Sequence, residues 1–218
     1  MILDKNFSNL NVILVEPNGP LNVGSVARLC SNFEVNELRI VSPKCDIFSL
    51  DAKKMALKGQ EFLEHCKIFD CLEKAIFDCD LVLASCGRID ISKDSIIECS
   101  DDIFNWTLSF KKVNNLAIIF GREDRGLTNS ELLLANKTFN IPTSKNNPSL
   151  NLSHAVSIVL YELNNVNKSY RGNKNKELEV FNLASSKQIN DSFVEIEEML
   201  LRVGYLLKHT SRAVSYTH

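Results

Sequence analysis

Short runs of apolar residues recur along the chain, and the segments between them carry apolar residues at helical spacing. The runs cover positions 12–15, 38–41, 81–84, 116–120 and 139–141. Between the first two runs, one helical face carries Val23, Val26, Ala27, Cys30 and Phe33. Strands that alternate with helices are typical of α/β domains with a mostly parallel sheet. The pattern predicts this fold, with a further strand at 66–69 and a short helix at 72–77.

Residues that end strands gather between positions 116 and 163. The strand 116–120 stops at Gly121, and a charged turn follows up to Gly126. A second strand at 138–141 stops at Pro142, and a helix begins near Leu152. Ligands in open α/β folds bind at the carboxyl ends of strands, so we expect the functional site here.

The composition changes after Leu163. The segment NNVNKSYRGNKNKE is polar and basic, which is typical of a flexible linker. Beyond it, apolar residues alternate at spacings of four and three, at Ile189, Phe193, Ile196, Leu200, Val203 and Leu207. This stripe predicts a helix that packs on the domain, on a second subunit or on a segment outside this sequence. We therefore expect a domain at 1–165, a basic linker at 166–178 and a helical extension at 179–218.

The bulk composition excludes several classes of protein. With 44% hydrophobic and 24% charged residues, the chain has the balance of a soluble globular protein, and no apolar run approaches the ~20 residues that span a membrane. The first residues lack the features of a secretory signal, so we expect a cytoplasmic protein. The seven cysteines show no zinc-ligand spacing and predict reduced thiols and no metal site. A net charge of -2 means that any RNA binding must use a local basic patch.

The loop after the first strand combines small and polar residues. Gly19 and Gly24 have the spacing of a phosphate-binding P-loop, but the required lysine is missing, and no G-x-G-x-x-G is present. Asn22, Gly24 and Arg28 together are compatible with a bound anion facing Arg28. From the loop alone, a helix cap at Asn22 with a solvated Arg28 is the preferred interpretation. The loop alone leaves both interpretations open.

Three motifs in order carry a resemblance. They are Asn22-x-Gly24-x-x-Ala27-Arg28, Gly121-x-Glu123-x-x-Gly126-Leu127, and Ile141-Pro142 followed by Ser149-Leu150-Asn151-Leu152-Ser153. This chain resembles the SpoU/TrmH family of RNA ribose 2′-O-methyltransferases over residues 11–163. The segments VEPNGPLNVGSVARLCSNF and GREDRGLTNSEL are most similar to those of TrmJ-type tRNA methyltransferases.

The resemblance implies a fold, a cofactor and an oligomeric state. The fold is the SPOUT α/β fold with a C-terminal trefoil knot, followed here by a short helical extension, and members of the family work as homodimers. The cofactor is S-adenosylmethionine, and the matching positions imply that it contacts Ser85, Cys86, Gly87, Gly121, Ile141, Pro148, Ser149 and Leu150. The motif Ser85-Cys86-Gly87-Arg88 departs from the Thr-Ser-Ala-Arg that is common in the family.

The resemblance also implies the catalytic and RNA-binding residues. Arg28 would act on the ribose hydroxyl, Asn22 and Asn151 would orient it, Glu123 would fix the motif loop, and Ser149 would lie at the cofactor edge. For RNA binding we expect Arg28, Arg88, Arg122, Arg125, Lys168, Arg171, Lys174 and Lys176. The substrate implied is tRNA, with nucleotide 32 as the target. The alternatives are another tRNA position, ribosomal RNA, or a non-catalytic RNA-binding module of the same fold.

Overall fold

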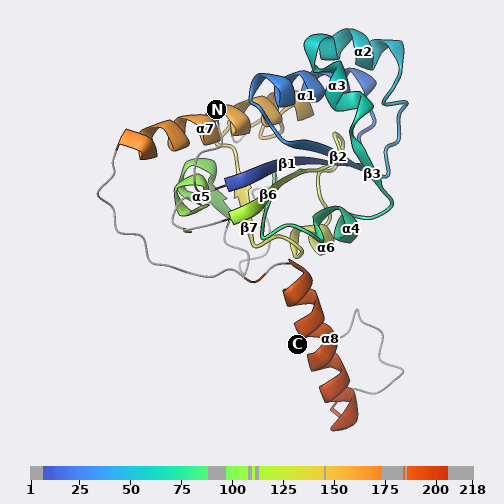
Figure 1. Ribbon diagram of the computed structural model, residues 1–218, viewed down its shortest axis with the longest axis vertical. Coiled ribbons are helices and arrows are strands. Elements are labelled where there is room, and N and C mark those ends of the chain that lie inside the picture. Colours follow the sequence, from blue (N-terminus) through green and yellow to red (C-terminus); the bar gives the residue numbers. More distant parts are fainter. Residues whose placement is uncertain are drawn as a thin grey trace.

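A parallel β-sheet forms the centre of the molecule. The computed structural model describes residues 7–87, 97–107, 110, 113–144, 146–172, 184 and 186–205. Within these residues the sheet has seven strands in the order β3-β2-β1-β6-β4-β7-β5, and each neighbouring pair is parallel (Figure 1). The strands are β1 (Phe7–Val15), β2 (Glu37–Val41), β3 (Lys67–Phe69), β4 (Leu81–Ser85), β5 (Ile97–Cys99), β6 (Val113–Phe120) and β7 (Lys137–Asn140).

Helices cover both faces of this sheet. They are α1 (Pro20–Asn32), α2 (Leu50–Ala56), α3 (Gln60–Glu64), α4 (Leu72–Ile76), α5 (Ser100–Thr107), α6 (Asn129–Leu132), α7 (Leu152–Gly172) and α8 (Ser186–Arg202), with the 3₁₀ turn η1 (Leu57–Gly59) between α2 and α3. Figure 1 shows α1 and α7 on one side of the sheet and α4 and α6 on the other. Along β1, Val12 and Leu14 pack with the first group, whereas Ile13 and Val15 pack with the second. Because both faces are buried, the strands are apolar along their length.

The predicted α/β fold with a mostly parallel sheet is confirmed. All five predicted apolar runs overlap strands, and the strand and helix predicted at 66–69 and 72–77 correspond to β3 and α4. The short elements β5 and α5 were not predicted. Their apolar residues are few, and burial of Ile103 and Phe104 against the sheet defines α5 instead.

Helix α7 extends further than the composition suggested. It runs to Gly172, through the first residues of the linker predicted at 166–178. Val166 packs against the core and Asn167 is buried, so tertiary contacts continue the helix into a polar sequence. Residues 173–183 lie outside the described residues, and the division into domain, linker and extension stays a prediction.

The helix predicted at 189–207 is confirmed in part as α8, which ends at Arg202; Val203 follows the helix and Leu207 lies outside the described residues. Within its apolar stripe Phe193 and Ile196 are exposed, at 56% and 47% of the maximal accessible area, whereas Ile189 and Leu200 are half-buried. The partner of this stripe, which the sequence left open, stays open. No helix in the described part of the chain is long and apolar enough to cross a bilayer.

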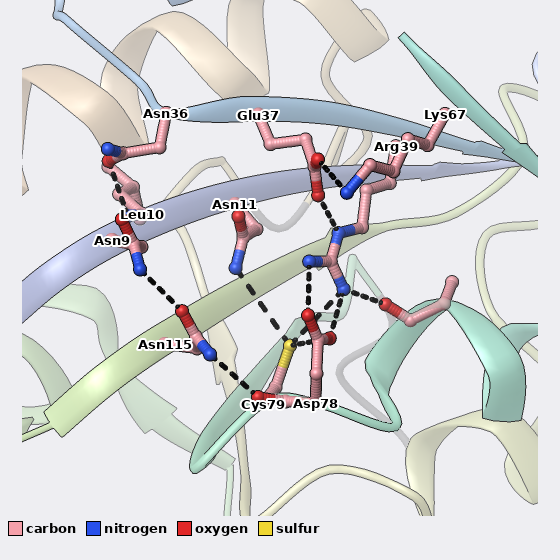
Figure 2. A network of polar contacts seen from close by, with 11 residues as sticks. Asn9, Leu10, Asn11, Asn36, Glu37, Arg39, Lys67, Asp78, Cys79 and Asn115 are labelled. Carbon is pink, nitrogen blue, oxygen red and sulfur yellow. Dashed lines mark hydrogen bonds and ion pairs between the residues drawn. The ribbon is translucent and has the colours of Figure 1, made fainter.

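Figure 2 shows a polar network that links β1, β2 and β6 to the turn before β4. Its centre is Arg39 on β2, which pairs with Glu37 and Asp78 and also donates to the carbonyl of Ala75. The hydrogen bond from Arg39 lowers the pKa of Asp78 more than partial burial raises it. The side chain of Arg39 is only 5% exposed, so a buried charge needs these partners. The network therefore fixes the segment before β4 against β2.

Candidate active site

The carboxyl ends of all strands meet at one edge, because the sheet is parallel. The loops that follow β1, β2, β4, β6 and β7 therefore lie side by side. These loops carry the residues that the three motifs predict. Two adjoining cavities open there, and both use the turn 122–125 that follows β6.

The larger cavity has a volume of about 440 Å³ and lies at the ends of β4, β6 and β7. This volume is within the roughly 300–1,000 Å³ usual for small-molecule sites. All eight residues predicted to contact the cofactor line it, namely Ser85, Cys86, Gly87, Gly121, Ile141, Pro148, Ser149 and Leu150. Further apolar walls, beyond the expected cofactor contacts, come from Phe120, Leu127, Leu152 and Ala155. The cavity therefore combines main-chain polar groups with apolar surface.

The turn after β6 requires glycine at both ends. A Cβ on Gly121 would lie 2.3 Å from the carbonyl carbon of Gly126 and 2.4 Å from the nitrogen of Leu127. Gly126 has a φ of +68°, a conformation that favours glycine. An antiparallel bridge between Arg122 and Gly126 closes the turn on itself. This geometry explains the Gly121-x-x-x-x-Gly126 spacing as a requirement of the backbone.

Glu123 ties the turn after β6 to the loop after β1. Its carboxylate accepts hydrogen bonds from the main-chain N–H groups of Asn18 (3.0 Å) and Gly19 (3.1 Å). It also accepts one from Nδ2 of Asn22 at 3.2 Å. Since these three donors converge on one carboxylate, Glu123 positions the start of α1.

Asn22 continues this contact to the third motif. Its Oδ1 accepts a hydrogen bond of 3.0 Å from Nδ2 of Asn151. Oδ1 of Asn151 in turn accepts hydrogen bonds from the N–H and the hydroxyl of Ser153, so Asn151 caps the start of α7. Glu123, Asn22 and Asn151 form one hydrogen-bonded chain across three segments, and each of its two hydrogen bonds joins residues more than 100 positions apart in the sequence.

Comparisons with known proteins place the sequence of this chain in a family. Residues 9–161 match the SpoU rRNA Methylase family. The chain belongs to this family. It is 39% identical over 156 residues to the tRNA (cytidine-2'-O-)-methyltransferase TrmJ of Methanocaldococcus jannaschii, covering 71% of this chain and 66% of that protein. The enzyme of the same name from Sulfolobus acidocaldarius is 42% identical, with 71% of this chain and 64% of that protein covered. The chain thus spans slightly less than two thirds of the length of these relatives.

Solved structures show the same fold. The crystal structure of TrmJ from Z. mobilis ZM4 superimposes with a TM-score of 0.74 at 25% identity, covering 91% of this chain and 82% of that chain. A probable methylase family protein from Haemophilus influenzae gives 0.70 at 27% identity, covering 92% and 82%. The predicted SPOUT-type fold is confirmed by these matches, while the trefoil knot remains an implication of the family.

The family residue Arg28 lies apart from the hydrogen-bonded chain. It is exposed on α1 and makes no hydrogen bond or ion pair with another described residue. Ser149, also exposed, lines the larger cavity. The structure therefore brings Asn22, Glu123 and Asn151 into direct contact and leaves the Arg28 guanidinium available to solvent.

Arg122 has a structural role that the sequence did not reveal. Its side chain is 9% exposed and pairs with Glu16 at 2.9 Å and with Glu131 at 2.8 Å. The hydrogen bond from Arg122 is the main cause that lowers the pKa of Glu16. Glu131 also completes a capping box with Thr128 at the start of α6. Because Arg122 is enclosed and neutralised, this geometry argues against its predicted contact with RNA.

The other predicted RNA-binding residues are distributed more widely. Arg125 is 63% exposed beside the cavities, and Lys168 is exposed on α7. Arg171 belongs to the last turn of α7. Arg88, Lys174 and Lys176 lie outside the described residues. Only Arg125 of the described group adjoins the cavities.

Proposed function

We propose that this chain is an S-adenosylmethionine-dependent methyltransferase that modifies a ribose 2′-hydroxyl in tRNA, at nucleotide 32 of the anticodon loop. One observation carries the proposal. The chain of hydrogen bonds joining Glu123, Asn22 and Asn151 adjoins the cavity that all eight expected cofactor residues line. The two archaeal relatives, both named as tRNA cytidine 2'-O-methyltransferases, support the substrate and the reaction.

The larger cavity fits S-adenosylmethionine by its size and lining. Gly87 leaves open space beside its main chain, so the backbone after β4 is accessible to a ligand. Gly121 and Leu150 would flank the same ligand from the turns after β6 and β7. When bound, the cofactor supplies a methyl group activated by a sulfonium. The role of the protein is to hold this ligand in a cavity with apolar walls that limit the access of water.

The remaining polar residues suit the positioning of a ribose. Asn22 and Asn151 are hydrogen-bonded to each other beside Glu123, which lines the cavity, and the bond from Asn22 to Glu123 fixes the Asn22 side chain. Alignment of a hydroxyl for in-line attack can lower a barrier by about 7–11 kcal/mol. An arginine keeps its proton at pH 7, so Arg28 would bind the substrate phosphate and stabilise the developing alkoxide, and the proton would pass to phosphate or water.

We also propose that the chain acts as a homodimer, as the family resemblance implies. The exposed apolar stripe of α8 supports an additional partner surface. Light scattering coupled to size-exclusion chromatography would measure the mass directly. A mass of one chain at working concentration would contradict this part of the proposal.

Incubation with bulk tRNA and methyl-labelled S-adenosylmethionine, followed by mapping of the labelled nucleotide, tests the function. We expect label on a ribose 2′-hydroxyl of nucleotide 32. Label at another position or in ribosomal RNA would correct the substrate and retain the chemistry. Failure to bind S-adenosylmethionine in calorimetry would refute the enzyme and favour a non-catalytic RNA-binding module.

A further inference from the structure

A second cavity lies beside the first, at the carboxyl ends of β1, β2 and β6. It has a volume of about 260 Å³. This is smaller than the roughly 300–1,000 Å³ of a complete small-molecule site, so it suits one part of a larger ligand. Neither the motifs nor the family resemblance assigns a role to it.

The charged groups of this second cavity divide into two sets. Glu16, Arg122 and Glu123 are already engaged, since Arg122 pairs with Glu16 and Glu123 accepts the three donors of the loop after β1. The other set is exposed and weakly paired. Arg125 approaches Glu16 only to 3.5 Å and Asp124 only to 3.8 Å.

Lys44 completes the exposed set from the other side of the cavity. Its main-chain N–H donates to the carbonyl of Pro17 at 3.0 Å, which holds the loop after β2 against the loop after β1. Its side chain is exposed and pairs with no other described residue, although its charge contributes to the lowered pKa of Glu16. Lys44, Asp124 and Arg125 therefore offer two cationic donors and one anionic acceptor that a ligand can engage.

The balance of charge indicates which ligand fits. The lining contains three acidic and three basic side chains, namely Glu16, Glu123, Asp124, Lys44, Arg122 and Arg125. The acidic and basic charges balance, so the cavity offers no net attraction for an anion such as a phosphate. A nucleobase is neutral and presents both donors and acceptors along one edge, and enzymes that act on single nucleotides read this edge by hydrogen bonds. The guanidinium plane of Arg125 can also stack on a base.

We propose that the second cavity binds the base of the nucleotide whose ribose is methylated, with Asp124 accepting from the base and Lys44 donating to it. This inference rests on the proposed function. The two sites share Glu123, whose carboxylate holds Asn22 next to the ribose position. A base is joined to its ribose by one bond, so a base bound beside Glu123 places its ribose beside Asn22.

The test compares two tRNA substrates, one intact and one with an abasic ribose at the nucleotide mapped for the wild-type protein. The steady-state kcat/KM on each substrate is measured for the wild type, Asp124→Ala, Lys44→Ala and the control Lys54→Ala. Lys54 is an exposed lysine of α2 outside the cavity, so Lys54→Ala changes the net charge by the same amount as Lys44→Ala. Calorimetry with S-adenosylmethionine checks Lys44→Ala, which should bind the cofactor as the wild type does, because Lys44 does not line the larger cavity.

We expect the wild type and Lys54→Ala to lose at least about 10-fold to 100-fold in kcat/KM on the abasic substrate, the range for one hydrogen bond to a charged group. Asp124→Ala and Lys44→Ala should be slower on intact tRNA and should lose clearly less on removal of the base. Equal rates of the wild type on both substrates would overturn the base site alone. So would an equal loss in all four proteins, since the base would then be read elsewhere. Absence of methylation of intact tRNA by the wild type would instead overturn the proposed function, and the base site with it.

Discussion

Substitution of Gly24 by alanine tests whether the position of α1 depends on a close helix contact. Gly24 faces the main chain of α2, and an added Cβ would lie 2.1 Å from the carbonyl oxygen of Ala52 and 2.9 Å from its carbonyl carbon. Ordinary nonbonded contact between such atoms is at about 3.5 Å, so the two helices would have to separate by roughly 1.4 Å. The obstructing atoms belong to the backbone, and no rotamer change can relieve the overlap.

Two effects of the Gly24→Ala substitution oppose each other. Alanine is better than glycine in a helix interior by about 0.8–1 kcal/mol. Overpacking costs about 1–3 kcal/mol, and contact with a rigid carbonyl places this site at the upper end or beyond. The net expectation is a loss of about 2 kcal/mol in the free energy of unfolding. For a chain of this size the corresponding fall in Tm is about 4–8 °C.

Urea unfolding and thermal unfolding of Gly24→Ala measure this loss directly. The matched control is Ser25→Ala, the next residue in the same helix, whose hydroxyl donates only to the carbonyl of Leu21. The control should stay within about 0.5 kcal/mol of the wild type. If Gly24→Ala were as stable as the wild type, or more stable, the close contact would not constrain α1 and the reasoning would fail.

Three further predictions concern the site and its support. Arg28→Ala should leave S-adenosylmethionine binding by calorimetry unchanged and lower single-turnover methylation by about 10²–10³-fold, as for loss of one charge-stabilising donor; full activity would remove Arg28 from the mechanism. Glu123→Gln should lower the rate of methylation by about 10-fold or more, because an amide NH₂ would replace one acceptor opposite the main-chain donors. In the double variant with Asn22→Ala, the loss of rate should be smaller than the sum of the two single losses in free energy. Additive losses would show that the two residues act separately. The hydrogen bond from Arg39 lowers the pKa of Asp78 in the folded state. The contribution of this bond to the free energy of unfolding is therefore complete above the ordinary pKa of 3.8 and is lost as the pH falls through the folded pKa. Asp78→Asn should be less stable than the wild type at pH 7, and the difference in stability should shrink below about pH 4.

Local sequence was sufficient for the central elements of the fold. The apolar runs that predict β1, β2, β4, β6 and β7 are long enough to bury both faces of a strand. Glycine and proline mark their ends, because backbone restrictions act within a few residues. Elements with a weak local signal, such as α5, are defined by the surface on which they pack. The extension of α7 beyond Leu163 has the same cause, since Val166 finds the core only in the folded chain.

The candidate site was only partly encoded in local patterns. The eight residues expected to contact the cofactor all line the larger cavity, since each lies in a loop that follows a strand and parallel strands end at one edge. The role of Arg122 was not predictable in this way. Its partner Glu16 is 106 positions distant, and a charged turn looks the same in sequence whether its arginine is solvated or enclosed.

The sequence by itself determined the strands, the turns that glycine permits and the three segments that carry polar residues, because these depend on periodicity and on the backbone. The tertiary structure decided which of those polar groups are engaged and which are free. It joined Glu123 to Asn22 and Asn151, enclosed Arg122, and left Lys44, Asp124 and Arg125 around a second cavity. The physical reason is that hydrogen bonds and ion pairs depend on distances between side chains from different strands, and the order of strands in the sheet sets those distances.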